Sequence, residues 1–300
     1  MRKPDFFLVG APKCGTTALN DYLAAHPDIF MCPRKESHHF CAAWSTGYLA
    51  ERAAYLQLFA GARTEKRVGE ASVWYLYAPQ TAVALHEFCP HAQINIMLRN
   101  PCDMLHALHA HRLFIASEDI EDFAAALDAE PARRAGQRLP AWPHPISGLF
   151  YRDLARYTER VQHYFDIFGR ARVRVIIYDD LRADTPRVYR ETCAWLGVAD
   201  DFQPEFRIVN AAKRIRSPLL RRYLDHPPNW LRRIGGPLSP RAWRHNLLHR
   251  LRRLNTQHAP RPPLPEALHH TLQDEFRPDI QRLSELLGRD LSHWHGGSGQ

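Results

Sequence analysis

The chain has 300 residues, a length that fits one α/β domain or one domain with an added lobe. No run approaches the ~20 apolar residues that a membrane-spanning helix needs, and we expect no signal peptide before the first strand. The formal net charge of +8 indicates anionic partners such as a nucleotide, a polyanion, a nucleic acid or a membrane surface. Six cysteines at irregular spacing favour reduced thiols in a cytoplasmic protein.

Apolar runs predict five strands in chain order, at 5–10, 28–31, 67–70, 94–98 and 173–178. Between and after them, apolar residues at helical spacing predict helices at 16–26, 48–59, 79–88, 103–116, 149–168 and 184–197. Proline fits two of these boundaries, since Pro27 closes the first helix and Pro79 suits the first turn of the third. Strands that alternate with helices predict a parallel sheet covered on both faces.

The remaining segments differ in composition. A loop rich in proline and arginine is predicted at 129–147, and Asp225 is the only acid in the arginine-rich stretch 207–263. We expect one domain over the whole chain, 1–300. Its predicted parts are an α/β core at 5–217, a basic, proline-interrupted segment at 218–264, helices at 265–294 and a flexible tail at 295–300.

The first strand runs into a glycine loop, GAPKCGTT, at residues 10–17. The P-loop of NTPases reads G-x-x-x-x-G-K-[ST], with lysine directly after the second glycine. Here the glycines keep that spacing and Thr16 and Thr17 keep the hydroxyls, but the lysine lies inside the loop, at Lys13. Such a loop before a helix N-terminus presents backbone N–H groups and a favourable dipole to an anion. We therefore expect a phosphate-type ligand here.

An arginine stands where an ATP-using enzyme would place a metal-binding carboxylate. NTPases hold Mg²⁺ with the loop Ser or Thr and an Asp that ends another strand. The best candidate strand, 94–98, is followed by Arg99 instead. A cation at this point favours metal-free recognition of a phosphate by arginine. An ATP-dependent P-loop kinase or hydrolase, which would require Mg²⁺, is the alternative.

The chain resembles the sulfotransferases that use 3′-phosphoadenosine-5′-phosphosulfate (PAPS), from Phe6 to about Trp294. PKCGTTAL is similar to their 5′-phosphosulfate loop, and MLRNPCDMLHAL to the turn that grips the 3′-phosphate. GEASVWYL and LLGRDLSHW are also similar, and RKESHHF is nearer the carbohydrate, heparan-type branch. The resemblance implies a P-loop-NTPase-like three-layer α/β fold with a central parallel sheet flanked by helices. It also implies direct in-line sulfuryl transfer from PAPS to a hydroxyl or amine, leaving PAP.

The resemblance assigns roles on the nucleotide side, without a metal. Lys13 stabilises the leaving group, and Arg99 holds the 3′-phosphate. Ala107 stands where the family usually has a serine ligand. A later basic cluster either closes over the nucleotide or is a solvated turn. The implied nucleotide contacts are Lys13, Cys14, Gly15, Thr16, Thr17, Arg99, Ala107, Lys213, Arg214 and Arg216.

The acceptor side is expected in CPRKESHHF, residues 32–40. Glu36 matches the glutamate base of heparan-type enzymes, and Lys35 beside it is expected to shape its pKa. His38 and His39 are the competing bases, because histidine titrates near neutral pH. The expected acceptor contacts are Lys35, His39, Glu70 and Tyr75.

The acceptor class stays open among small-molecule, glycan and lipid hydroxyls. No zinc-type pairing of ligands and no recognised nucleic-acid motif occurs, so neither a metal nor a nucleic acid is expected. A non-enzymatic basic nucleic-acid binder remains the second alternative. A basic amphipathic helix at 241–254 either packs on the core or contacts an anionic membrane or polyanion. The expected location is cytoplasmic, with peripheral membrane contact through this segment as a variant.

Overall fold

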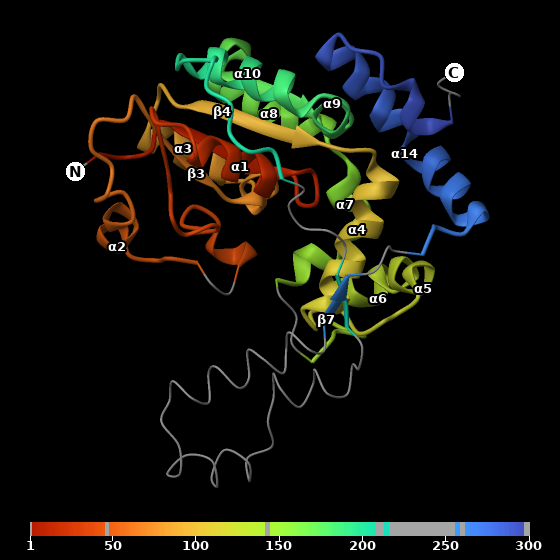
Figure 1. The fold of residues 1–300 in the computed structure, drawn as a ribbon. Helices are drawn as coiled ribbons and strands as arrows, with labels where there is room; N and C mark the ends of the chain where they lie inside the picture. Colours follow the sequence, from red (N-terminus) through yellow and green to blue (C-terminus); the bar gives the residue numbers. More distant parts are fainter. Residues whose placement is uncertain are drawn as a thin grey trace, which may run out of the picture.

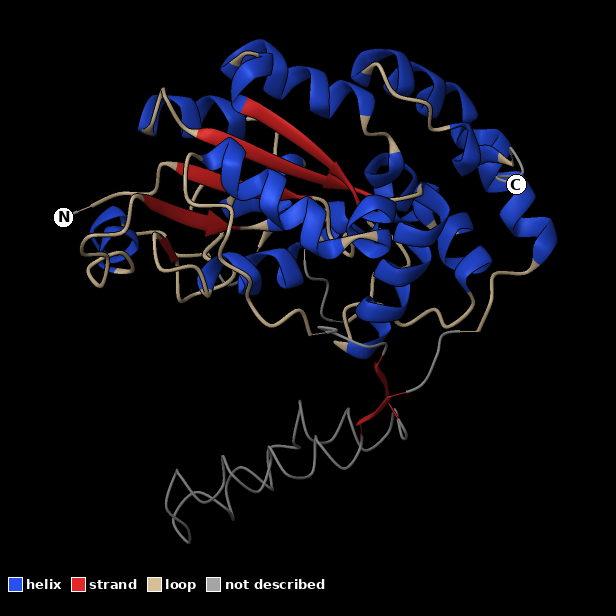
Figure 2. Ribbon diagram, turned by 45° about the horizontal axis from the view of Figure 1, so that its top comes forward, coloured by secondary structure: helices blue, strands red, loops and turns tan. Residues whose placement is uncertain are grey.

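The computed structural model describes residues 2–45, 48–141, 145–207 and 262–296, and the backbone of two short strands at 213–215 and 256–258. Within these residues, helices cover both faces of a central sheet (Figures 1 and 2). The predicted three-layer α/β fold is therefore confirmed.

The central sheet has five parallel strands in the order β2-β3-β1-β4-β5. Every residue of β1 is buried, which accounts for its uninterrupted apolar run FFLVG. After β1 the chain builds β2 and β3 on one side and β4 and β5 on the other. This reversal predicts a ligand crevice beyond the carboxyl ends of β1 and β4. The strands are β1 (Phe6–Gly10), β2 (Ile29–Met31), β3 (Arg67–Ala71), β4 (Gln93–Leu98) and β5 (Val173–Ile177).

Eleven α-helices occur in the described residues, and side-chain caps mark several of their starts. Asn100 accepts a hydrogen bond from the Cys102 N–H at the start of α4, and Asp184 accepts one from Arg187 N–H at the start of α10. The helices are α1 (Thr16–Ala24), α2 (Arg52–Gln57), α3 (Thr81–Phe88), α4 (Pro101–Phe114), α5 (Phe123–Asp128), α6 (Glu130–Arg134), α7 (Tyr151–Ala155), α8 (Thr158–Phe168), α9 (Tyr178–Ala183), α10 (Thr185–Leu196) and α14 (Glu266–Leu287).

Short 3₁₀ turns join several of these elements. They are η1 (Ala42–Trp44), η2 (Val73–Leu76), η3 (Ile146–Leu149), η4 (Arg170–Arg172) and η5 (Ser292–His295). The two strands outside the main sheet, β6 (Lys213–Ile215) and β7 (Thr256–His258), pair with each other in antiparallel fashion. The rest of the predicted basic segment up to residue 261 lies outside the described residues, as do residues 297–300 of the predicted tail.

The single helix predicted at 149–168 is wrong, because the structure has two helices there, α7 and α8. The buried carboxylate of Asp279, on α14, accepts a hydrogen bond from the Tyr157 N–H at 2.8 Å. The Thr158 hydroxyl also donates to the Asp279 carbonyl at 2.9 Å. A partner distant in sequence thus caps the start of α8 and interrupts the helical run.

Two further predictions missed short helices. The predicted loop at 129–147 contains α6 and the start of η3. The strand predicted to reach Tyr178 ends at Ile177, and α9 begins at Tyr178. The residues of α9 bind the C-terminal region, because the Asp180 carboxylate accepts hydrogen bonds from both terminal nitrogens of Arg289. The predicted C-terminal helix is present as α14.

Candidate active site

The glycine loop connects β1 to α1 in a conformation that requires glycine at its end. Gly15 has φ +87°, and a Cβ there would lie 2.9 Å from the Leu181 side chain. Cys14 beside it is fully buried, and its thiol donates to the Pro12 carbonyl. Burial raises the pKa of this thiol to about 12, so it stays protonated at neutral pH. The backbone of Cys14 remains with the loop, but its thiol is directed inward.

A cleft of about 860 Å³ opens at the carboxyl end of the sheet, in front of this loop. Its walls come from the loop and α1, the segment after β2, the turn η2 and the second half of α4. The predicted site residues that line it are Lys13, Thr16, Thr17, Lys35, Glu36, His38 and Ala107. The structure therefore brings the proposed leaving-group lysine and the proposed base into one cavity.

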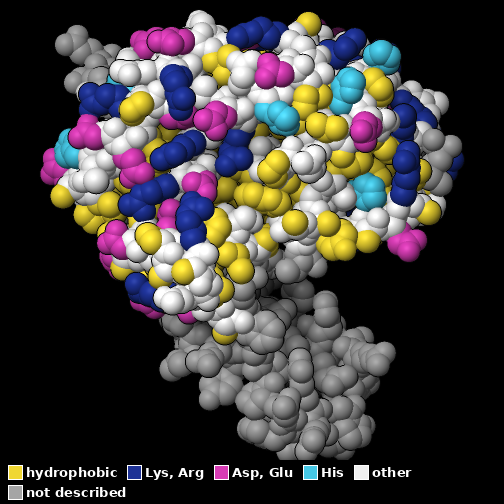
Figure 3. Space-filling view, turned by 180° about the vertical axis from the view of Figure 1, so that it is seen from behind, with side chains coloured by type: hydrophobic (Ala, Val, Ile, Leu, Met, Phe, Trp, Pro, Cys, Tyr) yellow, Lys and Arg dark blue, Asp and Glu magenta, His cyan; other side chains and the backbone are white. Residues whose placement is uncertain are grey.

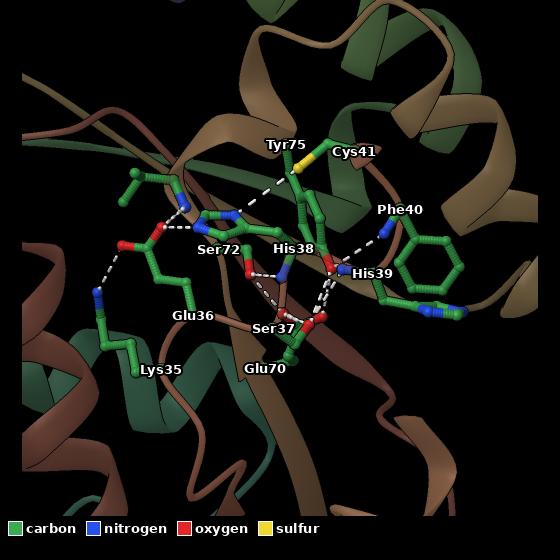
Figure 4. Close-up of polar contacts among 11 residues, drawn as sticks. Lys35, Glu36, Ser37, His38, His39, Phe40, Cys41, Glu70, Ser72 and Tyr75 are labelled. Carbon is green, nitrogen blue, oxygen red and sulfur yellow. Dashed lines mark hydrogen bonds and ion pairs between the residues drawn. The ribbon is translucent and has the colours of Figure 1, made fainter. Parts of the chain in front are cut away.

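Glu36 is held in the cleft by three donors (Figure 4). Its Oε1 lies 3.3 Å from the Lys35 ammonium. Its Oε2 lies 3.2 Å from His38 Nε2 and accepts the Val73 N–H at 3.2 Å. Val73 begins η2, so a backbone donor from a distant turn orients this carboxylate. No pattern in the sequence indicates that contact.

Behind the loop, Glu70 is the centre of a buried hydrogen-bond network. Its Oε1 accepts the hydroxyls of Ser37 and Ser72, at 2.9 and 2.7 Å. Its Oε2 accepts those of Tyr55 and Tyr75, both at 3.0 Å. Burial raises the pKa of Glu70, while the four hydroxyl donors act in the opposite direction.

This network corrects the expectation that Glu70 and Tyr75 contact the acceptor. Both side chains are 0% exposed, and neither lines the cleft. Glu70 acts on the loop instead, through the serines that it holds. Ser72 Oγ accepts the His38 N–H at 3.1 Å. Ser37 Oγ likewise accepts the His39 N–H at 3.3 Å. Figure 4 shows Ser37, Ser72 and Tyr75 converging on Glu70 beneath the Glu36–His38 pair.

The two histidines of the loop have different surroundings. His38 lines the cleft, and its Nδ1 lies 3.7 Å from the Cys41 sulfur. The His39 ring stacks on Tyr55 at 4.2 Å between centroids, and its Nδ1 lies 2.6 Å from the Leu49 carbonyl oxygen. His39 is absent from the cleft lining, which argues against its predicted roles as base and acceptor contact.

Arg99 follows β4 and has an unpaired buried nitrogen. One terminal nitrogen is 2.9 Å from the Asp103 carboxylate, and the guanidinium lies over the Tyr178 ring at 4.8 Å. Its Nε is buried with no hydrogen-bond partner among the described residues. A buried donor of this kind calls for an acceptor such as a phosphate oxygen. Two turns further on, Ala107 lines the cleft from α4 and offers no hydroxyl.

The remaining expectations concern the later basic cluster, a metal site and a membrane-spanning helix. Lys213 and Arg214 lie on β6, where only the backbone is described, and Arg216 lies outside the described residues. No group of three or more His, Cys, Asp or Glu able to hold a metal ion occurs in the part of the chain that the structure describes. Within that part, every helix is too short or too polar to cross a bilayer.

Arg112 is among the cleft residues that no sequence pattern indicated. Arg112, in the last turn of α4, lines the cleft but is only 2% exposed. Its signal in the sequence is weak, because an arginine near the end of a helix is usually a solvated cation.

Comparisons with known proteins identify the family of the chain. The model of the sulfotransferase family matches residues 4–203. A sulfotransferase from Alicyclobacillus acidocaldarius superposes with a TM-score of 0.74 at 30% identity, covering 98% of this chain and 99% of that one. Human heparan sulfate glucosamine 3-O-sulfotransferase 6 is 21% identical over 97% of this chain and 73% of its own length.

A further relative is much longer than this chain. The bifunctional heparan sulfate N-deacetylase/N-sulfotransferase 1 of Caenorhabditis briggsae is 25% identical over 68% of this chain, which spans 23% of that protein. The family match covers the glycine loop, the Glu36 segment, β4 and Arg99 together. The predicted resemblance to sulfotransferases is thus confirmed at the level of the family. The chain belongs to the sulfotransferase family.

Proposed function

We propose that the cleft binds PAPS along the glycine loop and passes its sulfuryl group to a hydroxyl of a glycan-type acceptor. The observation that carries this proposal is the placement of Lys13 and Glu36 in one cleft. The named activities of the heparan sulfate relatives support a glycan acceptor. Small-molecule and lipid hydroxyls are the alternatives that an acceptor screen separates.

In the proposed reaction, Glu36 takes the proton of the acceptor hydroxyl as its oxygen attacks sulfur. The bond between sulfur and the bridging oxygen of the 5′-phosphate breaks, and its electron pair stays on that oxygen. Lys13 stabilises this developing charge from within the loop. Preorganised electrostatic stabilisation of this kind typically contributes ~10²–10³ in rate.

His38 supports Glu36 in this scheme. Burial raises the pKa of the Cys41 thiol, so the thiol stays protonated and can donate to His38 Nδ1. That hydrogen bond favours the tautomer that carries its proton on Nε2, which then donates to Glu36. Lys35 adds a positive charge on the other oxygen. Together these donors aim the carboxylate into the cleft.

Arg99 is assigned to the 3′-phosphate, for which its unpaired Nε is suited. The basic residues Lys213, Arg214 and Arg216 are proposed to close over the nucleotide. The segment 241–254 is proposed to contact a polyanion or an anionic membrane surface, on the evidence of its sequence alone.

The proposal is tested by thermal unfolding with nucleotides. PAP should raise the Tm without added Mg²⁺, because a ligand that binds only the folded state stabilises it. ATP, which lacks the 3′-phosphate, should raise it less. Incubation with PAPS and a panel of glycan, lipid and phenolic acceptors should then release PAP and add ~80 Da to one class. Equal stabilisation by ATP, or an absolute need for Mg²⁺, would contradict the proposal.

A further inference from the structure

Arg112 is a buried cation whose donors are incompletely used. Its side chain is 2% exposed, and its Nε and Nη1 are buried with no hydrogen-bond partner among the described residues. Burial lowers the pKa of Arg112 below its usual value, yet a guanidinium stays charged in proteins. An unpaired buried charge is strongly unfavourable unless a partner of opposite charge is supplied.

The described residues position this guanidinium without forming an ion pair with it. The nearby acid, Glu118, already accepts both terminal nitrogens of Arg133, at 2.8 and 2.6 Å, and the Tyr151 hydroxyl at 2.9 Å. Trp74 lies beside Arg112 with its ring 5.4 Å from the guanidinium carbon. Gly148 packs so closely that a Cβ there would lie 1.8 Å from Arg112 Nη2.

The same cleft holds Arg112 and the proposed base. Both line the cavity, and one turn, η2, contacts both. The Val73 N–H holds Glu36, while the ring of the next residue, Trp74, faces Arg112. Arg112 therefore lies on the acceptor side of the cleft, where a molecule whose hydroxyl reaches Glu36 would extend.

We propose that Arg112 binds an anionic group of the acceptor, a carboxylate or a sulfate, while a hydroxyl of the same molecule faces Glu36. This inference rests on the proposed function and specifies its substrate as an anion. Guanidinium groups pair with carboxylate and sulfate oxygens through charge-assisted hydrogen bonds. The acceptor thus provides the negative charge that the described residues do not pair with Arg112.

Three small glycosides test the proposal with PAP held at saturation. Methyl β-D-glucuronide and methyl β-D-glucoside 6-sulfate each carry an anion, while methyl β-D-glucoside is neutral. At matched ionic strength the two anions should raise the Tm of the wild-type protein, and the neutral glycoside should not. A response to one anion alone identifies it as the group recognised. No anion-dependent shift in the wild type would overturn the proposal.

Variants assign the effect to Arg112. Arg112→Met should weaken binding of the anionic glycoside roughly 10- to 100-fold, as expected for charged hydrogen bonds. Gly148→Ala should act in the same direction, because the new Cβ displaces the guanidinium. Arg160→Met is the matched control, since Arg160 is outside the cleft and bonds the Tyr77 and Asp153 carbonyls. An undiminished anion response in Arg112→Met would contradict the inference.

Stability without ligand gives a second, independent measurement. Because the described residues leave the charge of Arg112 unpaired, Arg112→Met should keep the Tm of the ligand-free protein at or above the wild-type value, whereas Arg160→Met should lower it. A marked loss of Tm in Arg112→Met would instead make Arg112 a structural residue. The rise in Tm caused by PAP is measured first and should be equal in the wild type and in Arg112→Met. It tests the nucleotide site separately. If PAP caused no rise in Tm, the proposed function would be wrong, and anion binding by Arg112 would be judged from the glycoside measurements alone.

Discussion

The carboxylate of Glu36 lies among three donors, and their number matters for its proposed work as a base. Lys35 contacts one oxygen of this carboxylate, and His38 and the Val73 N–H contact the other. These contacts give the carboxylate a fixed direction towards the acceptor, which catalysis by positioning requires.

Replacing Glu36 by Gln tests this directly. The substitution keeps shape and packing but removes the basic oxygen. With an alcohol acceptor kcat should fall by roughly 10²–10⁴, the usual contribution of a general base. The Kd for PAP, measured by titration, should stay nearly unchanged. His38→Asn should reduce kcat less than Glu36→Gln does. If His38→Asn reduced kcat more, His38 would be the base.

A substitution at Arg99 allows the contributions of the two phosphates to nucleotide binding to be measured separately. Arg99→Ala should weaken PAP binding more than binding of adenosine-5′-phosphosulfate, because only PAP carries the 3′-phosphate. Ala107→Ser, which adds a hydroxyl to the cleft wall, should tighten PAP binding by about 0.5–1.5 kcal/mol. Calorimetric titration of both ligands gives the comparison. Unchanged discrimination in Arg99→Ala would place the 3′-phosphate elsewhere.

At the scale of elements, the sequence predicts features that are set by residues adjacent in the chain. It does not predict features that are set by contacts with residues distant in the chain. The strand β1 and the loop after it could be predicted, because an apolar run and a glycine spacing are local signals. The break between α7 and α8 could not, since the cap comes from Asp279 on α14. The burial of Glu70 also escaped prediction: β3 is covered on both faces, so alternation gives no sign of which side chain reaches the cleft.

The α8 cap gives a stability prediction. Asp279→Ala removes the acceptor of the Tyr157 N–H and should lower the free energy of unfolding by about 0.5–2 kcal/mol. Asp279→Asn keeps an acceptor oxygen and should lose less. Denaturant titration of both variants measures the difference. Equal loss would assign the effect to the Arg282 ion pair, which both variants remove, rather than to the cap.

The Glu70 network predicts a pH dependence of stability. The pKa of Glu70 is raised above 4.5 in the folded state by burial, so the folded protein binds this proton more tightly than the unfolded chain. Its contribution to stability is therefore full below pH 4.5 and is lost as the pH rises through the folded pKa. Glu70→Gln should remove this part of the pH dependence. Unfolding measured at several pH values in both proteins tests it, and identical slopes would contradict the prediction.

At the scale of the whole molecule, the positive charge is unevenly distributed along the chain. Residues 208–261 contain 13 of the 40 Lys and Arg and one of the 32 Asp and Glu, so the remainder has a net charge of −4. On the face in Figure 3, basic and acidic side chains of the described residues are interspersed. Attraction to a polyanion should therefore come from 208–261, and within it we assign the contact to 241–254.

Two variants with equal charge loss test this assignment. Changing Arg244, Arg250, Arg252 and Arg253 to Gln should lower the salt concentration at which the protein elutes from a heparin column, because fewer counterions are released on binding. The matched control changes four exposed arginines, each paired with an acid: Arg134, Arg187, Arg207 and Arg277. Their neighbours already offset their charge, so elution should shift much less. Equal shifts would mean that net charge, and not this segment, governs polyanion binding.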